Sequence, residues 1–278
     1  MKSENGVLHV VATPIGNLGD ISERALATLR AVDLICAEDT RHTRPLLSHF
    51  GIDKPLFALH DHNEDAAAEQ IIARMQQGAS VALVSDAGTP LVSDPGFKLV
   101  RAARAAGIKV TPAPGASAVI AALSVAGLPS DKFVFEGFLS SKGAARRERM
   151  QQLAAETRTL IFYESSHRIV EHLQDAREAF GAERHVVIAR ELTKLFETVL
   201  DGSIEEVLAR VTADPNQQKG EFVVLLAGAS ETEDAKLHEG MRIYKALSAY
   251  LKPSVAAKIA ADLSGAPRKA LYGGHPQA

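Results

Sequence analysis

Short apolar runs alternate with amphipathic segments along the first half of the chain. The runs predict five β-strands, which begin near Leu8, Asp33, Pro55, Ser80 and Ile108. The segments between them carry apolar residues three or four positions apart, which predicts helices over residues 21–32, 66–78 and 97–107. Asp20 is the expected N-cap of the first helix, and a glycine ends each of the other two. Strands that alternate with helices predict an α/β fold with a mainly parallel sheet.

The pattern restarts with a different spacing after residues 127–130. Here the expected strands begin near Phe133, Thr159, His185, Phe196 and Glu221, and the expected helices cover 147–155, 169–180 and 204–211. A short connection between the third and fourth strands indicates that this second sheet is partly antiparallel and therefore mixed. We expect an N-terminal α/β domain over residues 1–127, a second α/β domain over 128–230, and an acidic linker with a small helical C-terminal region over 231–278.

The helical tail allows two interpretations. A helix capped by Ser254, a turn at Gly265 and a second short helix are compatible with a helix-turn-helix. A simple packed helical hairpin explains the same pattern equally well.

Composition narrows the class of protein. The chain has 278 residues, 46% of them hydrophobic, so it can bury a core and is not a disordered protein. Its net charge of −3 means that any nucleic-acid surface must be a local basic patch. The single cysteine, Cys36, lies in an apolar run and is expected to be buried and reduced. Without a signal peptide or a membrane-length apolar run, we expect a soluble, cytoplasmic protein.

Polar loops follow all five predicted strands of the first domain. Their sequences are TPIGNLGD, EDTRHTR, HDHNE, SDAGTP and APGASA. The carboxyl ends of parallel strands lie along one edge of a sheet, where ligands bind. Turn and cap residues would explain any one loop, but five in succession favour a ligand site. The P-loop pattern and the dinucleotide fingerprint are both missing from the sequence.

The stretch LVSDAGTPLVSDPG, residues 83–96, contains more turn residues than one turn requires. Asp94 and Pro95 predict a helix start, with Asp94 as the N-cap. Residues 85–90 then remain, and we interpret them as a ligand cradle. In this cradle Asp86 accepts hydroxyl or amine donors of the ligand, or lies near its cationic centre.

Other charged stretches have a structural and a functional interpretation. The charges of EDTRHTR could form a solvated, ion-paired loop, and KGAARRER could be a solvated helix face or a phosphate-binding patch. FYESSHR, ARELTK and KGEFVVLL place polar groups beside strands of the second domain. His60 and His62 could suggest a metal ion, but no second cluster with metal-ligand spacing follows, so we expect none.

Taken together, these motifs closely resemble the tetrapyrrole methylase superfamily, also called class III S-adenosylmethionine methyltransferases. The likeness runs over about residues 8–228. EDTRHT, SDAGTP and FYESSHR are similar in particular to the branch that methylates small-subunit ribosomal RNA, rather than to porphyrin methylases or diphthine synthases. Ser166 departs from this branch, where Thr or Pro is expected.

The resemblance implies that two α/β domains bind S-adenosylmethionine in the cleft between them. It implies that the methyl group goes to the ribose 2′-oxygen of a cytidine in the decoding region of 16S rRNA, and that the protein forms a homodimer, as family members usually do. The small ribosomal subunit is the expected partner, but the choice between free rRNA and the assembled subunit as substrate stays open. The family's cofactor-contacting motifs fall on Pro14, Gly16, Asp86, Gly88, Thr89, Ala116, Ser117, Tyr163 and Phe222.

Such a reaction is an in-line displacement at the methyl carbon, which requires no metal but needs a group that takes up the proton of the hydroxyl. The candidate bases or orienting groups are Glu38, Asp39, His60, Glu164 and His167. The candidates for contacts with RNA phosphates are Arg41, Arg44, Arg146, Arg147, Arg168 and Lys194. Two alternatives stay open, a class III methyltransferase for a small molecule and a non-catalytic RNA-binding module.

Overall fold

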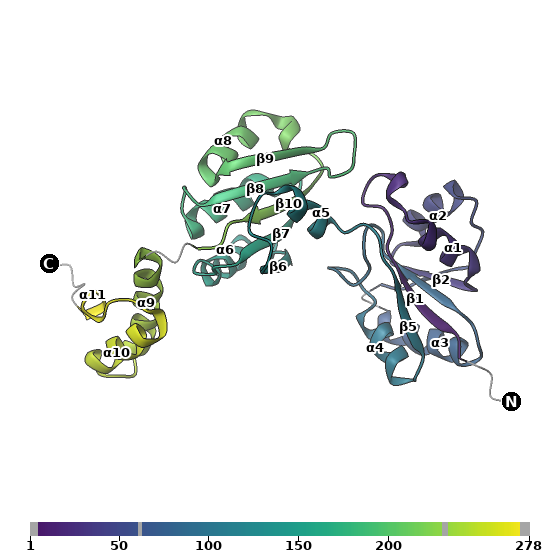
Figure 1. Cartoon of the computed structure of the whole chain (residues 1–278), viewed down its shortest axis with the longest axis horizontal. Helices are drawn as coiled ribbons and strands as arrows, with labels where there is room; N and C mark the ends of the chain where they lie inside the picture. The colour runs from purple at the N-terminus through teal and green to yellow at the C-terminus, as the bar shows by residue number, and fades with distance from the viewer. Residues whose placement is uncertain (1–4, 61–62, 230–232, 273–278) are drawn as a thin grey trace. The chain divides into compact units, whose positions relative to one another are not determined.

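The computed structural model describes residues 5–60, 63–229 and 233–272 (Figure 1). The chain forms two compact units. One consists of residues 1–126 with 188–199 and 220–223, and the other contains the rest. No helix within the described residues is both long and apolar enough to cross a membrane.

The first sheet has five parallel strands in the order β3-β2-β4-β1-β5. The strands are β1 (Val7–Val11), β2 (Leu34–Ala37), β3 (Leu56–Ala58), β4 (Val81–Val84) and β5 (Lys109–Ala113). The helices of this part are α1 (Glu23–Ala31), α2 (Thr40–His49), α3 (Glu64–Gln76), α4 (Phe97–Ala105) and α5 (Ala118–Val125). The five strands predicted from the apolar runs are thus confirmed.

Both faces of the first sheet are covered by helices, because successive side chains of a strand point to opposite faces. Leu34 and Cys36 of β2 pack in one core with residues of α3 and α4. Ile35 and Ala37 of the same strand pack in the other core with residues of α1 and α2. Cys36 is fully buried, as predicted, and burial raises the pKa of its thiol to about 12.

Two predicted helix caps near the first sheet are wrong. The N-cap of α1 is Ser22, which accepts a hydrogen bond from the Ala25 N–H, and Asp20 instead belongs to a short 3-10 helix (Leu18–Asp20). The N-cap of α4 is Gly96, with φ 120°, rather than Asp94. The acceptor at this helix start comes from α3: Glu64 Oε1 accepts hydrogen bonds from the N–H groups of Gly96 (2.9 Å) and Lys98 (2.8 Å).

Replacing Glu64 with alanine is therefore expected to destabilise the protein. Glu64 is 6% exposed, and its loss leaves two N–H groups of the α4 start without their acceptor. We expect the free energy of unfolding to fall by roughly 1–3 kcal/mol, measured by urea denaturation. Glu69→Ala, on the exposed face of the same helix, is the matched control. Equal losses in both variants would contradict this role of Glu64.

The second sheet is mixed, as predicted, and its strand order is β6-β7-β10-β8-β9. Its strands are β6 (Phe133–Phe138), β7 (Thr159–Ser165), β8 (His185–Arg190), β9 (Thr198–Ser203) and β10 (Glu221–Leu226). The accompanying helices are α6 (Gly143–Gln152), α7 (Ile169–Phe180), α8 (Ile204–Ala213) and a 3-10 helix (Pro215–Gln218). Helix α7 packs against both α6 and α8.

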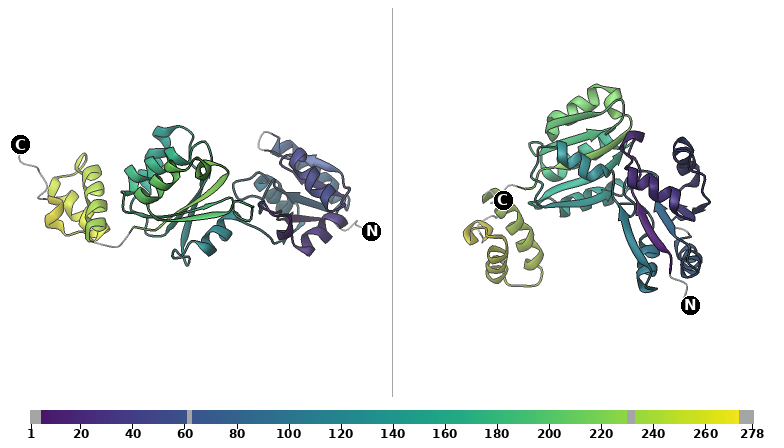
Figure 2. Two further views of the ribbon diagram at one scale, coloured as in Figure 1. Left: turned by 90° about the horizontal axis from the view of Figure 1, so that it is seen from above. Right: turned by 45° about the vertical axis from the view of Figure 1, so that its right-hand side comes forward.

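The C-terminal region contains three helices that pack against one another, α9 (Glu233–Ser248), α10 (Pro253–Ser264) and α11 (Arg268–Tyr272) (Figure 2). The predicted linker is wrong from Glu233 onward, because the acidic segment is helical there. The N-cap of α10 is Lys252, with Pro253 in the first turn, rather than Ser254. The turn at Gly265 is left-handed (φ 71°), as the sequence predicts.

Candidate functional site at the carboxyl edge of the first sheet

The order of the strands places a binding crevice between β1 and β4. These strands are adjacent and parallel, but the chain leaves them in opposite directions. From β1 it crosses β4 to reach β2, and from β4 it crosses β1 to reach β5. In open α/β sheets, ligands bind at such a switch point, outside the carboxyl ends of the strands.

Three loops are joined by hydrogen bonds at this switch point. The N–H of Thr13, after β1, donates to the carbonyl of Gly88 (2.8 Å), and the Gly88 N–H donates back to the Thr13 carbonyl (3.1 Å). Thr89 Oγ1 donates to the carbonyl of Ala116, after β5, at 2.9 Å. The loops that follow β1, β4 and β5 are therefore held together as one surface, which we call the switch-point loops (residues 13–17, 85–90 and 114–117).

The backbone of Gly88 disfavours a side chain, and the space around it is tight. Its φ is 83°, and an added Cβ would lie 3.3 Å from Ile15 Cγ2 and 3.7 Å from the Ala116 carbonyl oxygen. Further along, Leu91 (φ 73°) and Ser93 (φ 66°) also adopt positive φ, which is costly for residues with a side chain. Strain of this kind is common at ligand-binding sites, so it supports a functional role for the segment.

Asp94 is a functional candidate that the sequence did not reveal. Its side chain is hydrogen-bonded to Ser85, and Asp86 lies close enough to affect its ionisation. Burial, and then the negative charge of Asp86, raise the pKa of Asp94 to about 6 in spite of the bond to Ser85. The sequence pattern pointed to a helix cap, because Asp before Pro is a common helix start.

A pocket with a volume of about 380 Å³ lies at the ends of β2, β3 and β4. It is lined by Glu38, Asp39, Thr40, Arg41, Ala58, His60 and Asp86. Three of the five predicted bases or orienting groups are therefore brought together here, with one of the predicted RNA-contacting arginines. We call this the acceptor pocket.

The stretch EDTRHTR is ion-paired, as one of the two interpretations above held, but it begins helix α2 rather than forming a loop. Asp39 is the N-cap of α2 and accepts a hydrogen bond from the Arg41 N–H at 2.8 Å. Its carboxylate also pairs with the exposed Arg41 guanidinium at 2.6 Å, and these bonds hold the pKa of Asp39 well below its usual value. Arg44, one turn further, is exposed. The Asp39 carboxylate is thus a poor proton acceptor.

His42, in the first turn of α2, connects this helix to the switch-point loops. Its Nδ1 lies 2.8 Å from Asp86 Oδ2, while Asp86 Oδ1 accepts a hydrogen bond from the Asp39 N–H at 3.1 Å. The hydrogen bond and the charge of Asp86 raise the pKa of His42, so the ion pair persists further toward neutral pH than a free histidine would allow. Recognising α2 from the helical spacing of Thr43 and Leu47 would have placed His42 here.

Other predicted site residues lie on strands of the second sheet or in the loops that follow them. Tyr163 lies on β7, where its ring contacts Phe135 at 4.9 Å and Phe138 at 5.4 Å. Phe222, on β10, is buried. His167, in the loop before α7, is exposed. Lys194 pairs with Glu191 (2.9 Å) and Glu221 (2.8 Å), so two carboxylates balance its charge.

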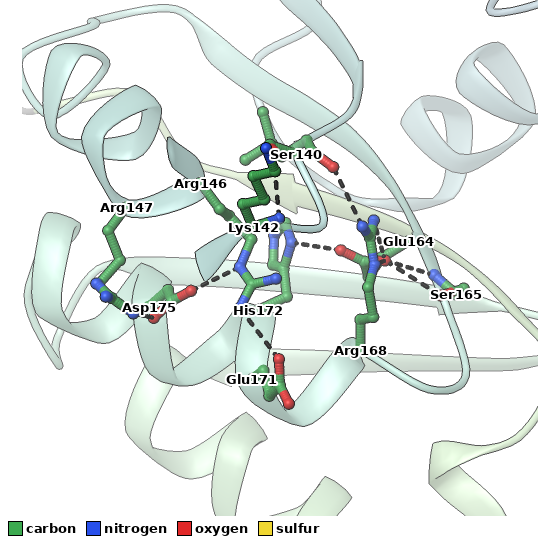
Figure 3. Close-up of polar contacts among 11 residues, drawn as sticks. Ser140, Lys142, Arg146, Arg147, Glu164, Ser165, Arg168, Glu171, His172 and Asp175 are labelled. Carbon is green, nitrogen blue, oxygen red and sulfur yellow. Dashed lines mark hydrogen bonds and ion pairs between the residues drawn. The ribbon is translucent and has the colours of Figure 1, made fainter. Parts of the chain in front are cut away.

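Glu164 is part of a buried network and is not suited to act as a base (Figure 3). Its side chain is 0% exposed, and its carboxylate pairs with Arg168 at 2.7 Å and with His172 Nδ1 at 3.0 Å. Burial alone would raise the pKa of Glu164, but the bonds from His172, the Ser165 N–H and Arg168 lower it. The network therefore positions the loop after β7, and Arg168 is mostly engaged in it.

Arg146 cannot contact RNA in this structure, which corrects the prediction for this residue. It is 2% exposed and pairs with Asp175 (2.6 Å) and Glu171 (3.2 Å), so it joins α6 to α7 (Figure 3). Arg147 is partly exposed and also pairs with Asp175, at 3.3 Å. The basic stretch is thus mainly a structural link between helices.

The described residues contain no group of three or more His, Cys, Asp or Glu side chains that could hold a metal ion. His62, which together with His60 suggested one, lies outside the described residues.

Solved structures with a similar fold include a methyltransferase and a diphthine synthase. The chain superposes on CobJ, described as a methyltransferase, with a TM-score of 0.60 and 21% identity over 81% of this chain and 95% of that one. Diphthine synthase gives a TM-score of 0.58 with 19% identity, over 80% and 89% of the two chains. At these identities the likeness concerns the fold alone.

Sequence comparison is more specific. Residues 7–208 match the family model of the tetrapyrrole (corrin/porphyrin) methylases, and residues 234–273 match that of the RsmI C-terminal HTH domain. A ribosomal RNA small subunit methyltransferase I from Xylella fastidiosa is 65% identical over 98% of this chain and 100% of its own length. The proteins of that name from Pseudomonas aeruginosa and Escherichia coli O157:H7 are 55% and 52% identical, over 96% and 97% of this chain and 95% and 94% of their own. The chain thus belongs to the tetrapyrrole methylase family and, within it, to the ribosomal RNA small subunit methyltransferase I group.

Proposed function

We propose that this protein methylates the ribose 2′-hydroxyl of a cytidine in the decoding region of 16S rRNA. The family makes it a methyltransferase with S-adenosylmethionine as methyl donor. The observation that supports the proposal most is the position of the acceptor pocket, which shares Asp86 with the switch-point loops. Its carboxylates and His60 offer hydrogen-bond acceptors for ribose hydroxyl groups, which an apolar acceptor would not require.

The switch-point loops fit S-adenosylmethionine. Gly88 lets backbone approach a ligand closely, and Ser117, the N-cap of α5, makes no side-chain cap, which leaves the first N–H groups of that helix for a ligand carboxylate. Asp86 and Asp94 supply negative charge toward a cationic centre. We propose that Pro14, Gly16, Gly88, Thr89, Ala116 and Ser117 contact the cofactor. When bound, the cofactor supplies an electrophilic methyl group.

The residues of the acceptor pocket then orient the ribose and take up its proton. Asp39 serves as a cap and as the partner of Arg41, so Glu38 and His60 are the better candidates for the proton acceptor. Neighbouring strands lie about 4.8 Å apart, which puts the end of β2 about 10 Å from β1 and the end of β3 about 14 Å away. Because Glu38 follows β2 and His60 follows β3, we propose Glu38 as the base and His60 as an orienting group.

The affinity for S-adenosylmethionine should depend on pH through Asp94. Its carboxyl group, with a pKa of about 6, is neutral at lower pH and negative at higher pH. Ionisation adds attraction for the cationic ligand, so affinity should rise by about threefold to tenfold between roughly pH 5 and 7. Calorimetry across this range measures the effect. Asp94→Asn should flatten the curve, and a wild-type curve without a step near pH 6 would contradict the assignment.

Methyl transfer with labelled cofactor tests the proposed function. The purified protein is incubated with free 16S rRNA and with small ribosomal subunits, both from cells in which the modification is absent. Mass spectrometry of the digested RNA should locate one 2′-O-methylcytidine in the decoding region. Transfer to small molecules but not to RNA would favour a small-molecule methyltransferase, and binding of RNA without transfer would favour a non-catalytic module.

The methyl-transfer assay also compares free rRNA with the assembled subunit as substrate, and light scattering tests the oligomeric state. We propose that the assembled subunit is the better substrate, and that a homodimer acts on it in the cytoplasm, where ribosomes assemble. Phe133 (37% exposed) and Phe138 (58% exposed) lie on β6, an edge strand, and such exposed apolar groups are common at subunit contacts. Light scattering at assay concentration would show a monomer if this part is wrong.

A further inference from the structure

The C-terminal helices form a basic unit in an acidic chain. Residues 233–272 contain seven Lys and Arg against four Asp and Glu, a net charge of +3, whereas the whole chain carries −3. Of the seven basic residues, Arg242 pairs with Glu239. The excess positive charge suits a polyanion.

A small apolar core fixes the arrangement of these helices. Ala257, Ala260, Ala266 and Leu271 are buried together, with Tyr244 packed against them. Gly240 of α9 lies so close to the end of α10 that an added Cβ would be 2.7 Å from Ser264 Oγ and 2.9 Å from Ala266 Cβ. Close packing therefore fixes the positions of the three helices, and with them the residues that face outward.

An exposed tyrosine and two basic residues lie near the start of α10. Tyr250, in the turn between α9 and α10, is 87% exposed, whereas Tyr244 of the preceding helix packs on the core. Lys252 follows Tyr250 by two residues and is exposed. The Arg268 guanidinium donates to the Ser254 carbonyl at 3.1 Å, which brings the start of α11 beside the start of α10. We call Tyr250, Lys252 and Arg268 the tyrosine patch.

We propose that the tyrosine patch binds an unpaired nucleotide of the RNA substrate. Tyr250 stacks on the base, and Lys252 and Arg268 contact the neighbouring phosphates. Aromatic rings with adjacent cations bind single-stranded or looped RNA in this way, since every base has a face that can stack. The inference rests on the proposed function for the identity of the RNA, and it adds a binding surface outside the acceptor pocket.

The test uses the full chain and measures RNA binding without cofactor. Filter binding of 16S rRNA at several salt concentrations is compared for wild type, Tyr250→Ala, Tyr250→Phe and Lys252→Gln. We expect Tyr250→Ala to weaken binding about tenfold and Tyr250→Phe to bind like wild type, because phenylalanine can still stack. Lys252→Gln should reduce the slope of affinity against salt by about one ion. Lys109→Gln, at the start of β5, is the control for charge.

The result can be separated from the proposed function. Calorimetric affinity for S-adenosylmethionine should be unchanged in all patch variants. If Tyr250→Ala and Lys252→Gln bind 16S rRNA as wild type does, or if wild type does not bind it, the patch proposal is overturned. Methyl transfer by wild type is measured in a separate assay, so failure of the patch proposal leaves the proposed reaction untouched. Conversely, if the protein binds RNA through the patch but transfers no methyl group, only the proposed reaction is contradicted.

Discussion

Replacing Glu38 with glutamine is expected to lower kcat for methyl transfer by about two to four orders of magnitude. Glutamine has nearly the same shape but cannot take up the proton of the ribose hydroxyl. Because the switch-point loops are unchanged, affinity for S-adenosylmethionine should stay as in wild type. Single-turnover transfer to small subunits measures the rate, and calorimetry measures cofactor binding.

Two comparisons make this prediction specific. Glu69→Gln, on the exposed face of α3, removes the same charge away from the pocket and should keep full activity. His60→Gln should have a smaller effect on kcat and a larger one on KM, because His60 follows the edge strand β3. A rate for Glu38→Gln within threefold of wild type, together with a large loss in His60→Gln, would transfer the role of base to His60.

The second large effect is expected for Asp86→Asn, which should weaken S-adenosylmethionine binding by about 10- to 100-fold and lower kcat/KM at least as much. Asp86 is the residue shared by the acceptor pocket and the switch-point loops. The substitution removes negative charge near a cationic ligand and breaks the ion pair with His42 at 2.8 Å. Calorimetry with the purified variant gives the affinity.

Two further variants separate the effect of the negative charge of Asp86 from the effect of its ion pair with His42. Asp53→Asn, before the amino end of β3, removes a similar exposed charge and should bind the cofactor normally. His42→Gln removes one of the two hydrogen bonds between Asp86 and the start of α2, and the bond from the Asp39 N–H remains. It should therefore weaken cofactor binding less than Asp86→Asn but still reduce kcat, because α2 is held less firmly to the β4 loop. Unchanged affinity in Asp86→Asn would rule out its role at the cofactor.

The sequence predicts the sheets well because burial on both faces leaves continuous apolar runs, such as the one at Ile35 and Cys36, with polar loops between them. Helix ends are predicted less well. The acceptor at the start of α4 comes from Glu64, 32 residues earlier in the chain, and no local pattern contains that contact. Helix α2 was missed because its first turn, Thr40 to Thr43, consists of polar residues, a composition that is also typical of a loop.

At the candidate site, too, local sequence patterns predicted the loops but not the contacts between residues far apart in the chain. The strand-end loops gave Glu38, His60, Asp86 and Gly88, because strand order brings the ends of parallel strands to one edge. The roles expected for Glu164 and Arg146 depended on exposure, and both side chains are buried in ion pairs that span different elements. Asp94 was assigned to a cap because Asp before Pro is a common helix start, whereas its hydrogen bond to Ser85 is a contact across a loop whose positive φ angles at Leu91 and Ser93 the residue types do not predict.

Hydrogen exchange of the full chain with and without saturating S-adenosylmethionine tests the central claim most directly. If the cofactor binds at the switch point between β1 and β4, amide exchange should slow in all three switch-point loops, 13–17, 85–90 and 114–117, and the helical region 233–272 should be unaffected. Unchanged exchange in these loops, with protection elsewhere in the chain, would contradict the account.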